Sequence, residues 1–177
     1  SALDLFCQST SCLTQPQYSE NSETSLKWNF TKDANGDYLV NPCENWYGLA
    51  CEGKGMIEAL LLSKTGLTGT IPSAIGALTD LVMFDVGYNA LVGSVPATLS
   101  GIANLRWLHI HGNAFTGPMN MTNTTGMNQL LVFNAYRNQF TGTIPEFPAM
   151  NNLTALYVDS NNLGSTLPST LTKLTAL

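Results

Sequence analysis

The sequence predicts an α/β solenoid with a curved parallel β-sheet on its concave face, an irregular or 3-10 convex side, and a helical, disulfide-bonded N-terminal cap. The first observation is a period. One position recurs at intervals of 24, 24, 25 and 23 residues and is occupied by Thr65, Asn89, Asn113, Asn138 and Asn161. A period of this length is typical of stacked repeats that share one core. The second observation is that all four cysteines precede the repeats.

The 177 residues divide into a region without repeats and a region with them. Residues 1–56 are expected to cap the first coil, because its apolar edge would otherwise meet water. Two apolar clusters in this cap predict short helices: Leu3, Leu5 and Phe6, then Leu26, Trp28 and Phe30. The five repeats are expected at 57–80, 81–104, 105–129, 130–152 and 153–176, with a sixth truncated at residue 177.

The second repeat shows why each coil would contain a strand. Phe84 and Val86 alternate with Asp85 and Gly87, which is the period of a strand with one buried face. Asn89, at the end of that strand, is expected to turn inward and bond backbone groups of adjacent coils that would otherwise be buried without partners. Asparagine at the same place in later coils predicts a ladder formed by Asn89, Asn113, Asn138 and Asn161.

The rest of the second repeat predicts the outer, returning side of the coil. Gly93 and Pro96 mark bends where a regular helix is disfavoured. Four apolar side chains are expected to line this side: Leu91, Val95, Leu99 and Ile102.

Each copy, from Ile57 to Ala176, has the form L-x-x-L-x-L-x-x-N-x-L-x-G-x-I-P-x-x-L-x-x-L. This unit resembles the leucine-rich repeat, and its G-x-I-P portion resembles the plant-type subclass. Residues 41–51, NPCENWYGLAC, are similar to the P-C-x-x-W-x-G-V-x-C motif that ends the N-terminal cap of plant-type members, and Trp28 matches the tryptophan that precedes it. Cys7 and Cys12 are not part of that pattern, which indicates a branch outside the best-known plant receptors.

The cysteines indicate an oxidising compartment. An even number of them in one terminal segment is typical of disulfides. Their spacing favours the pairs Cys7–Cys12 and Cys43–Cys51, although four cysteines allow three connectivities. A zinc site is the less favoured alternative, because there is no C-x-x-C motif and no histidine nearby.

Four N-x-[ST] sequons are candidate N-glycosylation sites: Asn29, Asn120, Asn123 and Asn152. Sequons also arise by chance in a chain rich in Asn and Thr. Together with the cysteines they favour a secreted or cell-surface protein that carries N-linked glycans.

The charge pattern gives no indication of a nucleic-acid partner. Charged residues make up 11% of the chain, the net charge is −5, and there is no basic patch or run. No stretch approaches the about 18 apolar residues that a membrane-spanning helix needs. No cofactor is expected.

The strand pattern also predicts which side chains face solvent on the concave sheet, with Gly87 among them and no pocket between them. Aromatic and arginine side chains on a rigid sheet are typical of binding hot spots, whereas singly scattered surface aromatics need no role. Because the rings converge on one face, we expect a ligand site there. Its residues are Met83, Asp85, Tyr88, Trp107, His109, His111, Asn134, Tyr136, Arg137, Tyr157 and Asp159.

Two further patterns have simpler alternatives. His109 and His111 point the same way beside Asp85, but a metal or catalytic site needs a third ligand or an oriented nucleophile, so no metal and no enzyme activity are expected. A partial row of threonines after each ladder position resembles an array for an ice lattice, but strand-forming surface threonine is the simpler account.

The sequence therefore predicts an extracellular, non-catalytic recognition module. The family resemblance implies a receptor ectodomain, adhesion protein or inhibitor whose ligand is a protein, peptide or cell-wall glycan. The alternative is a structural glycoprotein of a surface coat or filament. Since the sequence stops at Leu177 without a closing cap, either the parent protein continues or head-to-tail self-association covers that end.

Overall fold

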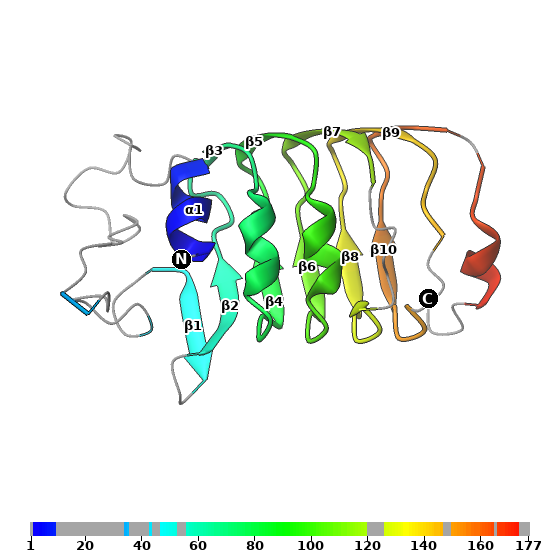
Figure 1. The fold of residues 1–177 in the computed structure, drawn as a ribbon. Helices are drawn as coiled ribbons and strands as arrows, with labels where there is room; N and C mark the ends of the chain where they lie inside the picture. Colours follow the sequence, from blue (N-terminus) through cyan, green and yellow to red (C-terminus); the bar gives the residue numbers. More distant parts are fainter. Residues whose placement is uncertain are drawn as a thin grey trace.

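The computed structural model describes residues 2–9, 34–35, 43, 47–52, 56–119, 126–146, 150–164 and 166–173. Successive coils stack side by side along one axis, with the helix α1 (Ala2–Ser9) at the N-terminal end (Figure 1). The predicted solenoid is confirmed. Within the part of the chain described here, no helix is both long enough and apolar enough to cross a membrane.

The concave face is one six-stranded sheet in the order β1-β2-β4-β6-β8-β10. Its strands are β1 (Leu49–Glu52), β2 (Met56–Leu61), β4 (Met83–Asp85), β6 (Trp107–His109), β8 (Val132–Asn134) and β10 (Ala155–Tyr157). From β2 onward the strands are parallel, and equivalent residues of successive repeats lie opposite one another, as Met83 does with Trp107. The in-register pairing follows from the repeat period, because each coil begins its strand at the same point.

The N-terminal edge of this sheet differs from the repeats. β1 pairs with β2 in the antiparallel direction, with an irregularity between Ala50 and Cys51. The sequence pattern did not predict this antiparallel strand. The helix α1 forms where the first apolar cluster predicted one, and Phe6 is fully buried with its ring edge-on to Phe84 at 6.1 Å. The second predicted helix, near Trp28, lies outside the described residues. The cap thus contributes an aromatic side chain to the core of the second coil.

A second, narrower sheet runs along the edge of the coils that is at the top of Figure 1, in the order β11-β9-β7-β5-β3. Its strands are β3 (Thr68–Gly69), β5 (Ala90–Gly93), β7 (Ala114–Pro118), β9 (Gln139–Gly142) and β11 (Asn162–Leu163). Thr68 lies opposite Ala90 and not opposite its equivalent Val92, so these strands slant across the stacking axis. The slant also places Thr116 opposite Gln139, so the threonines do not face one another in a straight row.

The convex side consists of short 3-10 helices, as predicted: η1 (Ser73–Ala77), η2 (Ala97–Gly101) and η4 (Ser169–Lys173). Pro72 and Pro96 stand at the N-caps of the first two with extended backbones. The expected lining of the return is buried, with Leu91, Leu99 and Ile102 fully inaccessible. Each proline fixes the extended backbone that leads into its 3-10 helix. Gly76 allows close packing of neighbouring turns, because a Cβ atom there would lie 2.7 Å from the Thr98 carbonyl oxygen.

Inward-facing asparagines hold each coil to the one before it. The Asn89 Oδ1 accepts hydrogen bonds from the backbone N–H groups of Thr65 (3.1 Å) and Leu67 (3.0 Å). Its Nδ2 donates to the carbonyl oxygens of Leu62 (2.8 Å) and Val86 (2.9 Å). One side chain therefore satisfies backbone groups of two coils in the partly buried space between them.

The same arrangement continues through the later coils. Asn113 donates to the Val86 carbonyl oxygen (2.9 Å) and accepts from the Leu91 N–H (3.0 Å). Asn161 donates to the Ala135 carbonyl oxygen (3.0 Å) and accepts from Phe140 (3.0 Å). Thr65, in the equivalent place of the first coil, is 3% exposed, and its hydroxyl donates to the Leu62 carbonyl oxygen (2.7 Å). A hydroxyl suffices there, because the antiparallel β1 and not another repeat precedes that coil.

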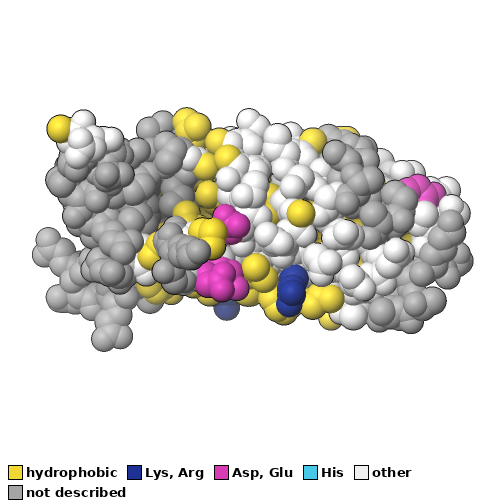
Figure 2. Space-filling view, turned by 60° about the horizontal axis from the view of Figure 1, so that its bottom comes forward, with side chains coloured by type: hydrophobic (Ala, Val, Ile, Leu, Met, Phe, Trp, Pro, Cys, Tyr) yellow, Lys and Arg dark blue, Asp and Glu magenta, His cyan; other side chains and the backbone are white. Residues whose placement is uncertain are grey.

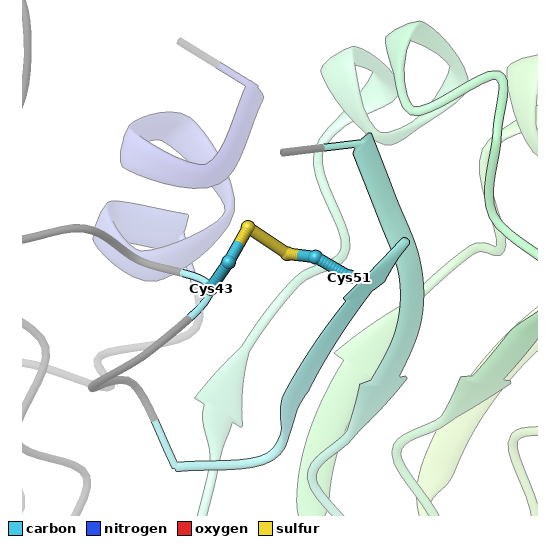
Figure 3. The surroundings of a disulfide bond; sticks show 2 residues. All are labelled: Cys43 and Cys51. Atoms are coloured by element: carbon cyan, nitrogen blue, oxygen red, sulfur yellow. A yellow bond between two sulfur atoms is a disulfide. The ribbon is translucent and has the colours of Figure 1, made fainter. Parts of the chain in front are cut away.

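The disulfide Cys43–Cys51 closes a loop of sequence separation 8 and joins the end of the cap to β1 (Figure 3). This confirms the second of the predicted pairs. Cys7 is also disulfide-bonded, and its predicted partner Cys12 lies outside the described residues.

Removing a ladder asparagine should destabilise the protein in proportion to its burial. Asn138 is 7% exposed, donates to the Ile110 carbonyl oxygen (3.0 Å) and accepts from the Phe115 N–H (3.1 Å). Asn138→Ala leaves both groups buried and unpaired, so we expect the free energy of unfolding in urea to fall by about 2–4 kcal/mol.

The matched control is Asn104→Ala. Asn104 is exposed and donates one hydrogen bond, to the Thr79 carbonyl oxygen at 3.2 Å. Its removal should change the free energy of unfolding by less than about 1 kcal/mol, because water replaces the lost bond. Equal losses in the two variants would contradict a special role for the inward asparagine.

Removing the Cys43–Cys51 bond should loosen the start of the sheet. The double substitution Cys43→Ser with Cys51→Ser frees the short loop without leaving a lone thiol, and it should lower the free energy of unfolding by about 2–3 kcal/mol. Urea unfolding measures this loss. Peptide mapping without reductant checks the premise, and free thiols at both positions in the native protein would refute it.

Candidate binding face

The parallel register arranges the concave side chains in rows that run across the coils. The first row is Met83, Trp107, Val132 and Ala155, and the second is Asp85, His109, Asn134 and Tyr157. Two residues further along each coil, the third row is Gly87, His111, Tyr136 and Asp159. Most of these side chains are half-buried, whereas Tyr157 is 50% exposed. The face is therefore a continuous surface with the rings at its centre partly held by their neighbours.

The residue before each ladder position has a left-handed backbone. The φ angle is +57° at Lys64, +49° at Tyr88, +63° at Gly112, +55° at Arg137 and +54° at Ser160. This conformation is uncommon for residues other than glycine, and no sequence pattern indicated it here. The chain turns at these positions from the concave strand toward the second sheet. We call this row of five residues the upper rim.

Gly87 is buried, which corrects the prediction that it faces solvent. A Cβ atom on Gly87 would lie 2.4 Å from the His111 Cε1 atom, so the imidazole of the next coil covers this glycine. The Tyr88 ring meets the His111 ring edge-on with 4.7 Å between centroids, and the Lys64 Nζ lies over the Tyr88 ring at 5.3 Å from its centroid. Because Gly87 has no side chain, the His111 ring of the next coil can pack directly on its backbone.

Burial of the His111 ring lowers its pKa; the charge of Asp85 partly opposes this shift, and the charges of His109 and Lys64 add to it. Its Nδ1 atom is buried without a hydrogen-bond partner among the described residues. Protonating this atom would place an N–H donor where nothing accepts it. Protonation of this imidazole is therefore less favourable in the folded protein than in the unfolded chain, which is the direction of the pKa shift.

Asp85 and His109 form a pair beside this stack. The His109 Nδ1 lies 3.8 Å from the Asp85 Oδ2, a distance typical of an ion pair and too long for a strong hydrogen bond. The Asp85 Oδ1 accepts from the Gly87 N–H at 2.9 Å. Burial raises the pKa of Asp85, but His109, the Gly87 amide and the charge of His111 together hold it below its usual range. In the described part of the chain, no three His, Cys, Asp or Glu side chains converge to hold a metal ion.

The upper rim contains a groove, whereas no pocket was predicted on this face. It has a volume of about 510 Å³. Its lining is Tyr88, Asn89, Ala90, Gly112, Asn113, Ala114 and Arg137. The groove lies where Gly112 interrupts the row of rim side chains. Gly112 lies between Tyr88 and Arg137 along the upper rim, and this arrangement is visible only in the tertiary structure.

A second hollow, of about 330 Å³, lies at the opposite, lower edge of the concave sheet. Figure 2 turns this edge toward the reader and shows acidic side chains beside hydrophobic ones, with a basic side chain further along. The lining residues are Glu52, Met56, Glu58, Asp80, Val82, Asn104, Arg106 and Gln129. None of them belongs to the predicted ligand face, because the strand pattern indicates the rows and not the turns that precede the strands.

Of the four sequons, the structure describes only the one at Asn152, and Asn29, Asn120 and Asn123 lie outside the described residues. Asn152 is exposed, and its Nδ2 donates to the Asn128 carbonyl oxygen at 2.8 Å. The Thr154 hydroxyl of the same sequon donates to the Leu131 carbonyl oxygen at 2.9 Å. Glycosylation of Asn152 stays a prediction.

The burial of His111 predicts a pH dependence of stability. The unfolded chain takes up a proton on His111 near the ordinary pKa of 6.5, whereas the folded chain does so only at lower pH. The unfolded state therefore binds more protons in this window, and stability should fall as the pH drops from 6.5 through the folded pKa. Urea unfolding at several pH values measures this, and His111→Phe, which keeps a ring over Gly87, should remove that part of the dependence.

The same shift can be read from NMR, because the chain has 2 histidines. His109→Gln assigns the two imidazole signals by removing one of them. We expect the His111 signal to titrate below pH 6.5 in the folded protein. A His111 midpoint at or above that value would show that burial does not lower the pKa of this ring.

Comparison with known proteins identifies similar chains. The Leucine Rich Repeat family profile matches residues 152–174. The chain is 34% identical over 130 residues to MDIS1-interacting receptor like kinase 1 of Arabidopsis thaliana, across 73% of this chain. Among solved structures, the leucine-rich-repeat ectodomain of the Arabidopsis thaliana receptor kinase SOBIR1 has a TM-score of 0.76 and 23% identity, covering 99% of this chain and 86% of that one.

Two other structures extend the comparison. The BIR2 ectodomain from Arabidopsis thaliana has a TM-score of 0.78 at 24% identity, covering 94% of this chain and 82% of that one. The plant peptide hormone receptor RGFR1 has a TM-score of 0.58 at 32% identity, covering 62% of this chain and 18% of that one. The chain covers 12% and 13% of two relatives to which it is 34% and 33% identical. With stacked coils of this period, the chain has the leucine-rich-repeat fold, and it resembles the ectodomains of plant receptor kinases.

Proposed function

We propose that this protein is an extracellular recognition module that binds a peptide or a segment of another protein on its concave face, without catalysing a reaction. The observation that carries the proposal is the convergence of Trp107, Tyr136 and Tyr157 with Arg137 on one face of an in-register sheet. Aromatic and arginine side chains at the centre of a surface contribute most to the binding energy of protein interfaces.

The rigidity of this face supports the proposal. Each strand bonds its neighbours in register, and the ladder asparagines fix the end of each strand to the coil before it. Half-buried rings such as Trp107 and Tyr136 have already lost part of their rotational freedom in the free protein. A ligand that packs on them therefore loses less free energy in ordering the surface.

A comparison supports the ligand class, and the disulfides support the compartment. RGFR1, which is 32% identical over the region compared, was solved in complex with RGF2. The disulfide Cys43–Cys51 and the disulfide-bonded Cys7 fit an oxidising compartment, as secretion or display at the cell surface would provide.

A display experiment tests the proposal with a defined probe. A phage library of random twelve-residue peptides is selected against the immobilised 177-residue chain, and enriched peptides are synthesised for affinity measurements. We expect Trp107→Ala and Tyr136→Ala each to weaken binding by roughly 2 kcal/mol or more, because both rings lie at the centre of the face.

The matched control is Val92→Ala. Val92 is 44% exposed on the second sheet, away from the concave rows, so its truncation should leave peptide affinity unchanged. Circular dichroism of all three variants excludes loss of fold. Peptides whose affinity is insensitive to both ring substitutions would show that the concave face is not the binding surface.

A further inference from the structure

We propose that the groove in the upper rim, between Tyr88 and Arg137, is a subsite for an acidic side chain of the peptide or protein segment that the concave face binds. The inference rests on the proposed function and adds the charge of the ligand and the place where that charge is recognised. It draws on the small residues that open the groove, the fixed ring at one end and the unpaired guanidinium at the other.

Small residues open the groove. Ala90 and Ala114 follow the ladder asparagines of the second and third coils, and Gly112 takes the rim position between Tyr88 and Arg137. In the fourth coil the residue equivalent to Ala114 is Gln139. The floor is therefore lined by two methyl groups and a glycine, which suits the short aliphatic part of an aspartate or glutamate side chain.

The Tyr88 ring forms a fixed wall at one end. A Cβ atom on Gly112 would lie 2.6 Å from the Tyr88 Cδ1, so the ring edge packs directly on this glycine. The His111 ring and the Lys64 ammonium hold it from other directions, at the distances given above. Tyr88 nevertheless remains 44% exposed. An exposed ring that is already immobilised can contact a ligand with little further loss of conformational entropy.

Arg137 supplies an unpaired positive charge at the other end. It is exposed, and within the described residues no carboxylate lies at ion-pair distance from its guanidinium and no hydrogen bond involves its side chain. Asp85, in the second row, is engaged by His109 and the Gly87 amide. Asp159 is the nearest acidic residue in the next coil, and its Oδ2 accepts from the Ser160 hydroxyl at 3.5 Å.

The chemistry of the groove favours a carboxylate over other groups. A guanidinium binds a carboxylate through two parallel hydrogen bonds, which gives direction as well as energy. The exposed Arg137 presents positive charge on a chain whose net charge is −5, so an acidic segment meets its complement here.

The test uses the random-peptide selection on the full chain and on two charge variants. Arg137→Gln removes the guanidinium of the groove, and Arg106→Gln makes the same change at the lower edge of the sheet. We expect peptides enriched on the unaltered chain to share an Asp or Glu, and Arg137→Gln to weaken them at least tenfold while Arg106→Gln has no such effect. Replacing the shared acid by Asn or Gln should weaken binding to the same extent.

A steric variant gives independent evidence. Ala114→Gln introduces the side chain that the equivalent position of the fourth coil already accommodates, so it fills the groove without disturbing the fold. It should weaken the acidic peptides at least tenfold. Ala97→Gln, on the exposed surface of η2, is the matched control and should have no effect.

The outcomes separate this inference from the proposed function. Peptides that lose affinity with Trp107→Ala or Tyr136→Ala but not with Arg137→Gln or Ala114→Gln would overturn the groove and leave the concave site intact. Enriched peptides without a shared acidic residue, or the absence of any enrichment, would overturn it too. Insensitivity to all four substitutions would remove both proposals.

Discussion

The hydrogen bonds of the inward asparagines are the constraint on which the rest of the structure depends. Each amide joins the end of one strand to the turn of the coil before it, at a place that is partly buried around Asn89 and buried around Asn138. A coil that lost its asparagine would leave buried N–H and carbonyl groups without partners, which is destabilising by more than a surface bond can offset. The period of the sequence is therefore also the period of a hydrogen-bond network, and this is what keeps the concave strands in register.

The left-handed row on the upper rim follows from the same constraint. An asparagine can point inward at the end of a strand only if the residue before it redirects the chain, and here that residue takes a positive φ in the five described repeats. For Lys64, Tyr88, Arg137 and Ser160 this conformation costs free energy, which the ladder on either side offsets. Because the backbone is held there regardless of the side chain, these positions can vary in chemistry without loss of fold. A row of this kind suits recognition, since specificity can change while the scaffold stays the same.

Packing between coils then decides what the surface can do. Gly87 allows the His111 ring to fold onto the strand, and His111 in turn supports Tyr88. Gly112 receives the edge of the Tyr88 ring and at the same time opens the groove toward Arg137. Gly87 and Gly112 thus allow the Tyr88 ring, the groove and the Arg137 charge to lie next to one another on an otherwise regular surface. Both histidines take part in this packing: His111 covers Gly87, and His109 lies beside Asp85.

The sequence by itself determined the solenoid, the buried return formed by Leu91, Leu99 and Ile102, the inward asparagines and the Cys43–Cys51 pair, because each of these depends on residue type and spacing within one coil or one short loop. Alternation along a strand is local, so it also indicated which side chains of each strand share the concave face, with the exception of Gly87. Only the tertiary structure decided the antiparallel β1, the slant of the second sheet, the burial of Gly87 and the groove between Tyr88 and Arg137. These features depend on how side chains about one repeat apart meet across neighbouring coils, and alternation within a strand carries no information about that contact.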